Sequence, residues 1–136
     1  MESAGNLSLE TIKNNKNYGL SISEAQEIPE LVKQGLYAIC ICLLGEKRSP
    51  DAAFILNNFG YPSIYIIGGL QQISLLSEKS QKNLFKLIIE APNVFITIDD
   101  FEQKQYENLL THLKPQEGRV VFCKDVGEIM DKYVQV

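Results

Sequence analysis

The residues best suited to chemistry in this chain lie in one short stretch, "CLLGEKRSP", which covers residues 42–50. Five residues separate the thiol of Cys42 from the guanidinium of Arg48, and Ser49 and Pro50 follow directly. Residues wrapped around a tetrahedral oxyanion can direct successive backbone N–H groups at its oxygens, and the planar fork of an arginine can bind two of those oxygens. The spacing therefore predicts an anion-binding loop made of Leu43, Leu44, Gly45, Glu46 and Lys47.

The thiol of Cys42 is the predicted nucleophile of this loop. A helix that begins near Pro50 would direct its positive end at the same point, and that field favours a thiolate over a thiol. Ser49 is placed to hydrogen-bond the sulfur and to assist its departure in a second step. A simpler interpretation stays open, because a buried strand can end in a cysteine that packs as a small hydrophobic residue. Ser-Pro is also an ordinary helix start.

The chain around the loop alternates apolar runs with amphipathic segments. Strands are predicted at 36–44, 63–69, 93–98 and 119–123, and helices at 50–59, at 71–90, after the third of these strands and after the fourth. This alternation predicts an α/β fold, a single three-layer domain with helices on both faces of a parallel sheet of four, or at most five, strands. Ligands bind such sheets at the carboxyl ends of strands, which is where Cys42 and its loop lie.

The bulk composition limits the classes of function. The chain has 136 residues, of which 45% are hydrophobic, enough for one packed domain, predicted over 21–136 after a polar N-terminal extension over 1–20. Its net charge of −4 does not favour nucleic acid as a partner. No apolar stretch is long enough to span a membrane and the N-terminus has no signal-peptide pattern, so a cytoplasmic protein is expected. A single His without metal-ligand spacing predicts no metal and no cofactor.

Three cysteines, an odd count, also favour a reducing compartment. We expect Cys40 and Cys42 to face opposite sides of their strand and so to be free thiols. For Cys123 two interpretations stay open. It is either a core residue or the partner that resolves an oxidised Cys42.

With these features described, the segment "ICLLGEKRSPDAA" resembles the active-site segment of low-molecular-weight protein tyrosine phosphatases, in which a strand runs into a Cys-x5-Arg-Ser-Pro loop and then a helix. At the level of topology the resemblance covers residues 37–136. It implies a hydrolase that acts on phosphotyrosine or another phosphomonoester through a phosphocysteine on Cys42. It further implies that Arg48 binds the phosphate, that a late aspartate protonates the leaving oxygen, and that the partner is a phosphorylated protein or a small phosphomonoester.

The candidates for that aspartate follow the third and fourth predicted strands. Asp99, Asp100 and Asp125 are all expected at the carboxyl edge of the sheet. Asp125 is the catalytic candidate, although Asp125 with Glu128 also forms the pattern of a helix capping box. Asp100 with Gln103 forms the same pattern, and for Asp100 we favour the capping role.

Two alternative functions remain open at this stage. Residues 45–69, "GEKRSPDAAFILNNFGYPSIYIIGG", are similar to a rhodanese pattern, which implies a sulfurtransferase with a persulfide on Cys42. Rhodaneses usually place four residues between Cys and Arg, and the five found here suit a phosphate-sized ion better. The other alternative is an anion- or phosphoprotein-binding module with weak or no turnover. It is favoured by the charge of Glu46 and by Leu44-Gly45, where the phosphatase family usually has Gly-Asn.

Overall fold

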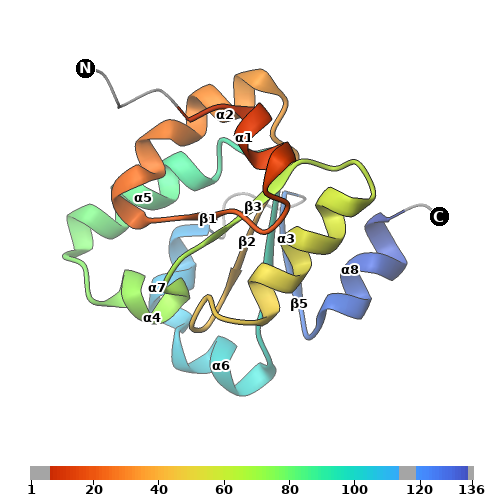
Figure 1. Ribbon diagram of the computed structural model, residues 1–136. Helices are drawn as coiled ribbons and strands as arrows, with labels where there is room; N and C mark the ends of the chain where they lie inside the picture. Colours follow the sequence, from red (N-terminus) through yellow and green to blue (C-terminus); the bar gives the residue numbers. More distant parts are fainter. Residues whose placement is uncertain (1–6, 114–118, 135–136) are drawn as a thin grey trace.

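The computed structural model describes residues 7–113 and 119–134, and its central layer is a parallel sheet of five strands (Figure 1). The strands lie side by side in the order β1-β3-β2-β4-β5, and every neighbouring pair is parallel. Their bounds are Gly19–Leu20 for β1, Ala38–Cys42 for β2, Ser63–Ile66 for β3, Asn93–Thr97 for β4 and Val120–Cys123 for β5. The α/β fold predicted from the sequence is confirmed, with the larger of the two predicted strand counts.

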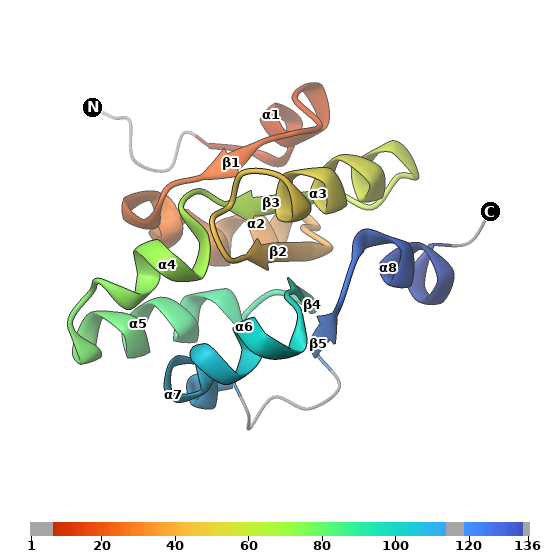
Figure 2. The same cartoon turned by 90° about the horizontal axis from the view of Figure 1, so that it is seen from below.

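Helices cover both faces of this sheet. They are α1 (Leu9–Asn14), α2 (Ile28–Gln34), α3 (Arg48–Asn58), α4 (Gly69–Ser74), α5 (Glu78–Ile88), α6 (Asp100–Gln105), α7 (Glu107–Leu110) and α8 (Val126–Tyr133), with 3-10 turns η1 (Ile22–Glu27) and η2 (Thr111–Leu113). Figure 2 shows α3 and α8 on one side of the sheet and α5 on the other. Among the described helices none has the length and apolar character needed to cross a bilayer.

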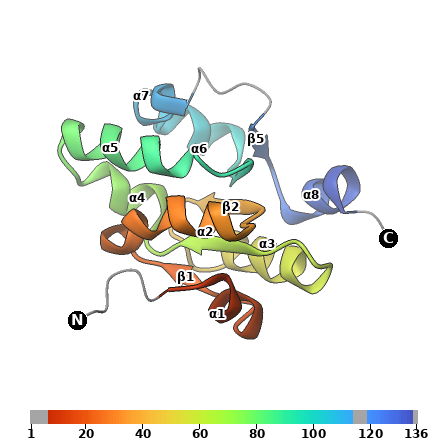
Figure 3. The same ribbon diagram turned by 90° about the horizontal axis from the view of Figure 1, so that it is seen from above.

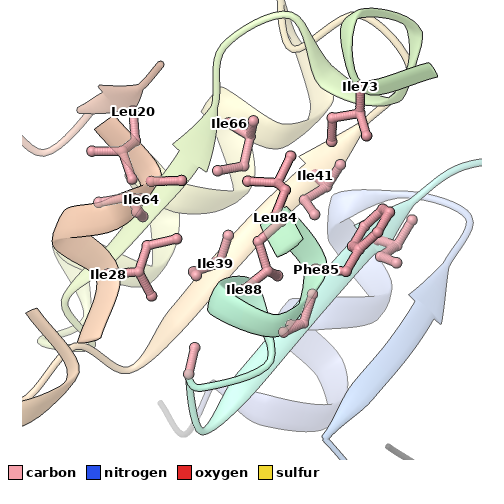
Figure 4. Close-up of a cluster of buried hydrophobic side chains, with 14 of the residues drawn as sticks. Leu20, Ile28, Ile39, Ile41, Ile64, Ile66, Ile73, Leu84, Phe85 and Ile88 are labelled. Atoms are coloured by element: carbon pink, nitrogen blue, oxygen red, sulfur yellow. The ribbon is translucent and has the colours of Figure 1, made fainter. Parts of the chain in front are cut away.

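The central strand β2 is buried along its whole length, which explains its unbroken apolar run. Ile39 and Ile41 pack with α2 and α5 in the larger core (Figure 4), while Ala38 and Cys40 pack with α3 and α8 in the smaller one. Residues two apart in a strand share a face, so Cys42 lies on the same side as Cys40. The expectation that these two thiols face opposite sides was wrong, although both are free thiols.

The described part of the segment predicted as a polar extension, residues 7–20, packs onto the domain. Leu9 and Ile12 of α1, one helical turn apart, are buried in the larger core. Leu20 of β1 is buried and is paired with Ile66 of β3. Strand β1 forms the edge of the sheet beside β3 (Figure 3). Only a few apolar residues in this stretch face inward, so its polar composition hides its contribution. Residues 1–6 lie outside the described residues.

The helices predicted after β2, β3 and β4 differ from those observed, and the one after β4 is divided into α6, α7 and η2. The segment 71–90 forms two helices, because Ser77 caps the start of α5 by accepting the backbone N–H of Ser80 (3.2 Å). Helix α3 begins at Arg48 with Lys47 as its N-cap, and not at Pro50 with Ser49 as the cap. Ser49 instead lies in the first turn, where its hydroxyl contacts the thiol of Cys42.

The strand order reverses at β2, and this reversal positions the site. From β2 the chain passes through α3 to β3 on one side, and later reaches β4 on the other side of β2. The connection after β2 leads to α3 on the smaller-core face, while the connection after β4 leads to α6 and to α7, whose Leu109 and Leu110 belong to the larger core. In open α/β sheets ligands bind at the carboxyl ends of the strands beside such a reversal. In Figure 1 this edge lies at the bottom, with α6 below the loop into α3.

Candidate functional site

The loop of residues 43–47 joins the end of β2 to α3 and contacts the sulfur of Cys42 through Gly45. The Gly45 N–H donates to Cys42 Sγ (3.3 Å), and the Cys42 thiol lies 3.2 Å from Ser49 Oγ. Cys42 is only 2% exposed and Ser49 is fully buried. The structure therefore brings Cys42, Gly45 and Ser49 together, as the sequence predicted for Cys42 and Ser49.

The loop is held by the Gly68-Gly69 turn that follows β3. Gly45 has φ +68° and Gly69 has φ +59°, values that favour glycine. A Cβ at Gly69 would lie 2.3 Å from the carbonyl oxygen of Cys42, and one at Gly45 would lie 2.6 Å from the carbonyl oxygen of Ile66. The Gln71 N–H also donates to the Leu43 carbonyl (3.0 Å). The Gly-Gly pair was read from the sequence only as the end of a strand, so its contact with the loop was missed.

Several backbone donors of the loop have no partner. Within the described residues, the N–H groups of Leu44, Glu46 and Lys47 make no hydrogen bond, and Lys47 gives α3 no side-chain cap. Unpaired N–H groups at a helix start are suited to binding an anion. Glu46 is exposed, and Lys47 pairs with Asp51 at the surface (3.8 Å). The charge of Glu46 is therefore solvated and does not occupy the space beside the sulfur.

Arg48 is engaged by a carboxylate from α6. Its Nη1 donates to Glu102 Oε1 (2.8 Å) and its Nη2 to Glu102 Oε2 (2.9 Å), a bidentate pair. The hydrogen bond to Arg48 lowers the pKa of the Glu102 carboxyl, and the same bond raises the pKa of the Arg48 guanidinium. Glu102 Oε1 also accepts the Asp99 N–H (3.0 Å), and Asp99 Oδ1 accepts the Glu102 N–H (2.8 Å).

Glu102 is the site residue that sequence reasoning missed. The capping box is Asp99 with Glu102, and not Asp100 with Gln103 as predicted. The letters "DDFE" contain the correct box one position earlier, so the cap itself had a sequence signal. Its ion pair with Arg48, 54 residues away, had none, because that contact depends on β2 and β4 being neighbours.

The predicted carboxylates have partners other than Cys42 and Arg48. Asp125 is the N-cap of α8, and its Oδ1 accepts the Glu128 N–H (3.1 Å). It follows β5, which lies two strands from β2, and within the described residues no hydrogen bond or ion pair joins it to the loop. Asp100 is exposed and pairs with Lys124 (3.6 Å). Asp99 forms a capping box with Glu102, the partner of Arg48, and its charge is among those that raise the pKa of Arg48.

Cys123 lies in a row with Cys42 across the sheet. Cys42 is paired with Thr97, and Thr97 with Cys123. Two strand spacings of about 4.8 Å place the two cysteines roughly 9.5 Å apart, beyond the reach of a disulfide without backbone movement. Burial raises the pKa of Cys123 to about 11. The geometry therefore favours the core interpretation of Cys123. Between the cysteines, the buried hydroxyl of Thr97 has no hydrogen-bond partner among the described residues.

Within the described residues, neither a metal cluster nor the cavity beside α5 and α7 coincides with this loop. In the described parts of the chain no three His, Cys, Asp or Glu side chains gather closely enough to hold a metal ion. A cavity of about 660 Å³ lies between the α4–α5 and α6–α7 segments, lined by residues such as Gln81, Tyr106 and His112. No family model, curated protein or solved structure matches this chain.

Proposed function

We propose that this protein is a phosphatase-like hydrolase that cleaves phosphotyrosine or another phosphomonoester, with Cys42 as the nucleophile. One observation carries the proposal. The sulfur of Cys42 accepts the Gly45 N–H and contacts the Ser49 hydroxyl inside a loop with unpaired N–H groups at the start of α3. A backbone N–H donor of this kind stabilises a thiolate, and the unpaired donors suit the oxygens of a phosphoryl group.

The reaction balances in two steps. In the first, the Cys42 thiolate attacks phosphorus, an S–P bond forms, and the P–O bond to the leaving group breaks. The leaving oxygen takes a proton from a carboxylic acid. In the second step water attacks phosphorus and gives its proton to the carboxylate formed in the first step, the S–P bond breaks, and inorganic phosphate leaves with the thiolate and the carboxylic acid restored. The Ser49 hydroxyl, 3.2 Å from the sulfur, would donate to the departing thiolate.

The proton donor is assigned to one of two aspartates at this edge of the sheet. Asp125 is the candidate from the sequence, whereas Asp99 forms a capping box with Glu102, the partner of Arg48. Both cap a helix, and asparagine is also a good N-cap, so Asp99→Asn and Asp125→Asn remove the acid while keeping the cap. The variant that loses the true acid should lower the rate by about 100- to 10,000-fold with a poor leaving group.

The test is hydrolysis of a small aryl phosphate between about pH 5 and 8. The wild type should turn over, Cys42→Ser should not, and Cys123→Ala should keep the wild-type rate because that thiol lies outside the loop. A wild type without turnover across this range contradicts the proposal. The sulfurtransferase alternative is tested in parallel with thiosulfate and cyanide, where thiocyanate formation that depends on Cys42 would support it over hydrolysis.

The ion pair between Arg48 and Glu102 favours a second candidate, an anion- or phosphoprotein-binding module with weak or no turnover. An arginine already bound to a carboxylate is not disposed to stabilise a transition state. This candidate predicts that added phosphate raises the melting temperature while no ester is hydrolysed. For either candidate the three free cysteines support a reducing compartment, and we retain the cytoplasm as the proposed location.

A further inference from the structure

We propose that Glu102 is a selectivity residue of the anion loop, which closes the loop by occupying Arg48 until an oxyanion displaces it. The inference rests on the proposed anion-binding role of the loop. Two anions, the Glu102 carboxylate and the incoming ligand, then compete for the guanidinium of Arg48.

The geometry of the ion pair supports this competition. Both carboxylate oxygens of Glu102 accept from Arg48, at 2.8 and 2.9 Å. A phosphoryl group uses the same planar fork with two of its oxygens. The Glu102 side chain is 13% exposed and that of Arg48 is 32% exposed, so the pair sits partly out of water. The carboxylate therefore takes the place on the arginine that a phosphoryl group would need.

At neutral pH an anionic ligand, and not protonation of Glu102, separates the ion pair between Arg48 and Glu102. Arg48 lowers the pKa of Glu102 below its ordinary value of 4.5, so the carboxylate stays ionised at neutral pH. An opposing anion is then the agent that separates the pair. This assigns selectivity to anions that make more contacts than the carboxylate does. A tetrahedral oxyanion can also accept from the unpaired N–H groups of Leu44, Glu46 and Lys47.

Helix α6, which carries Glu102, is exposed, so the Glu102 side chain can move away from Arg48. Helix α6 has six residues and none of them is buried. Its capping box joins Asp99 and Glu102, which are close neighbours in the chain. Rotating the Glu102 side chain away from Arg48 would therefore expose no buried residue of α6.

The decisive substitution is Glu102→Gln, which keeps the size of the side chain and an acceptor for the Asp99 N–H but removes the charge. If the closed pair leaves about one tenth of the molecules open, the apparent dissociation constant is about ten times the intrinsic one. We expect calorimetric titration with inorganic phosphate at pH 7 to show roughly tenfold tighter binding to Glu102→Gln, equivalent to about 1.4 kcal/mol. Glu128→Gln, a matched change in the cap of α8, should bind phosphate as the wild type does.

Three outcomes overturn the inference. Unchanged binding in Glu102→Gln would show that the carboxylate does not compete, and weaker binding would show that it positions Arg48 for the ligand. Absence of phosphate binding in both proteins also overturns it. Glu102→Asp provides a second variant if Glu102→Gln folds poorly. Its shorter side chain cannot span the same bidentate contact, so this variant should also bind phosphate more tightly than the wild type.

The hydrolysis proposal fails separately from this one. Tighter phosphate binding in Glu102→Gln without any phosphocysteine would support the competition and refute hydrolysis. Hydrolysis by the wild type with unchanged phosphate affinity in Glu102→Gln would support hydrolysis and refute the competition.

Discussion

Replacing Gly69 with alanine tests how the loop around Cys42 is held. Gly69 follows β3 and adopts φ +59°, and a Cβ there would lie 2.3 Å from the carbonyl oxygen of Cys42, 2.6 Å from that of Leu43 and 2.8 Å from the Gly45 nitrogen. All three atoms belong to the backbone, so no side chain can rotate to make room. The loop or the turn has to move.

The size of the effect follows from two contributions. A non-glycine residue in the left-handed region costs about 1–2 kcal/mol. Forcing a methyl group into a filled space costs typically about 1–3 kcal/mol more. The free energy of unfolding should therefore fall by about 2–5 kcal/mol, a large part of the roughly 5–15 kcal/mol that stabilises an ordinary domain. At about 3–4 °C for each kcal/mol, the melting temperature should fall by roughly 6–20 °C.

Gly60→Ala is the matched control. Gly60 also has a positive φ, +89°, but a Cβ there would have no atom within 4 Å. It should cost only the conformational contribution, about 1–2 kcal/mol. Urea unfolding of the two variants compares them directly. Equal destabilisation by Gly69→Ala and Gly60→Ala would refute the close packing of the Gly68-Gly69 turn against the loop.

Three further predictions concern stability. Thr97→Val removes a buried hydroxyl that has no hydrogen-bond partner among the described residues. Urea unfolding should show a free energy of unfolding higher by about 1–3 kcal/mol. A lower free energy of unfolding would show that the hydroxyl is hydrogen-bonded. Since Arg48 lowers the pKa of Glu102, the ion pair stabilises the fold above about pH 4.5 and the gain is lost as pH falls through the lowered pKa. The stability difference between wild type and Glu102→Gln should therefore be largest at neutral pH and vanish in acid, and a constant difference would contradict it. Asp125→Ala should lower the melting temperature through about 1 kcal/mol of lost capping, while Asp125→Asn should not.

The architecture was largely predictable because it depends on patterns within short segments. The apolar runs of β2 and β4 are continuous since both strands are buried on both faces, and the alternation of strands and helices predicts a parallel layer. The edge strand β1 was not predicted, since Gly19–Leu20 is two residues long in a polar stretch. Its place next to β3 depends on contacts far along the chain.

In the candidate site, too, contacts within one short segment were predictable and contacts between distant segments were not. The proximity of Cys42 and Ser49 follows from local spacing, since a loop and one helical turn join them. The pairing of Arg48 with Glu102 requires the strand order around β2, which no local pattern contains. The same order separates Cys42 from Cys123 by the width of β4, so the sequence could not decide between core packing and redox pairing.

The most direct test of the account is whether Cys42 carries a phosphoryl group during turnover. The protein would be mixed with an aryl phosphate, quenched rapidly in acid, digested and examined by mass spectrometry. The account predicts the mass of one added phosphoryl group on the peptide that contains Cys42, lost in Cys42→Ser and retained in Cys123→Ala. Ester hydrolysis by a wild type whose Cys42 peptide never gains that mass, or hydrolysis that survives in Cys42→Ser, would contradict it.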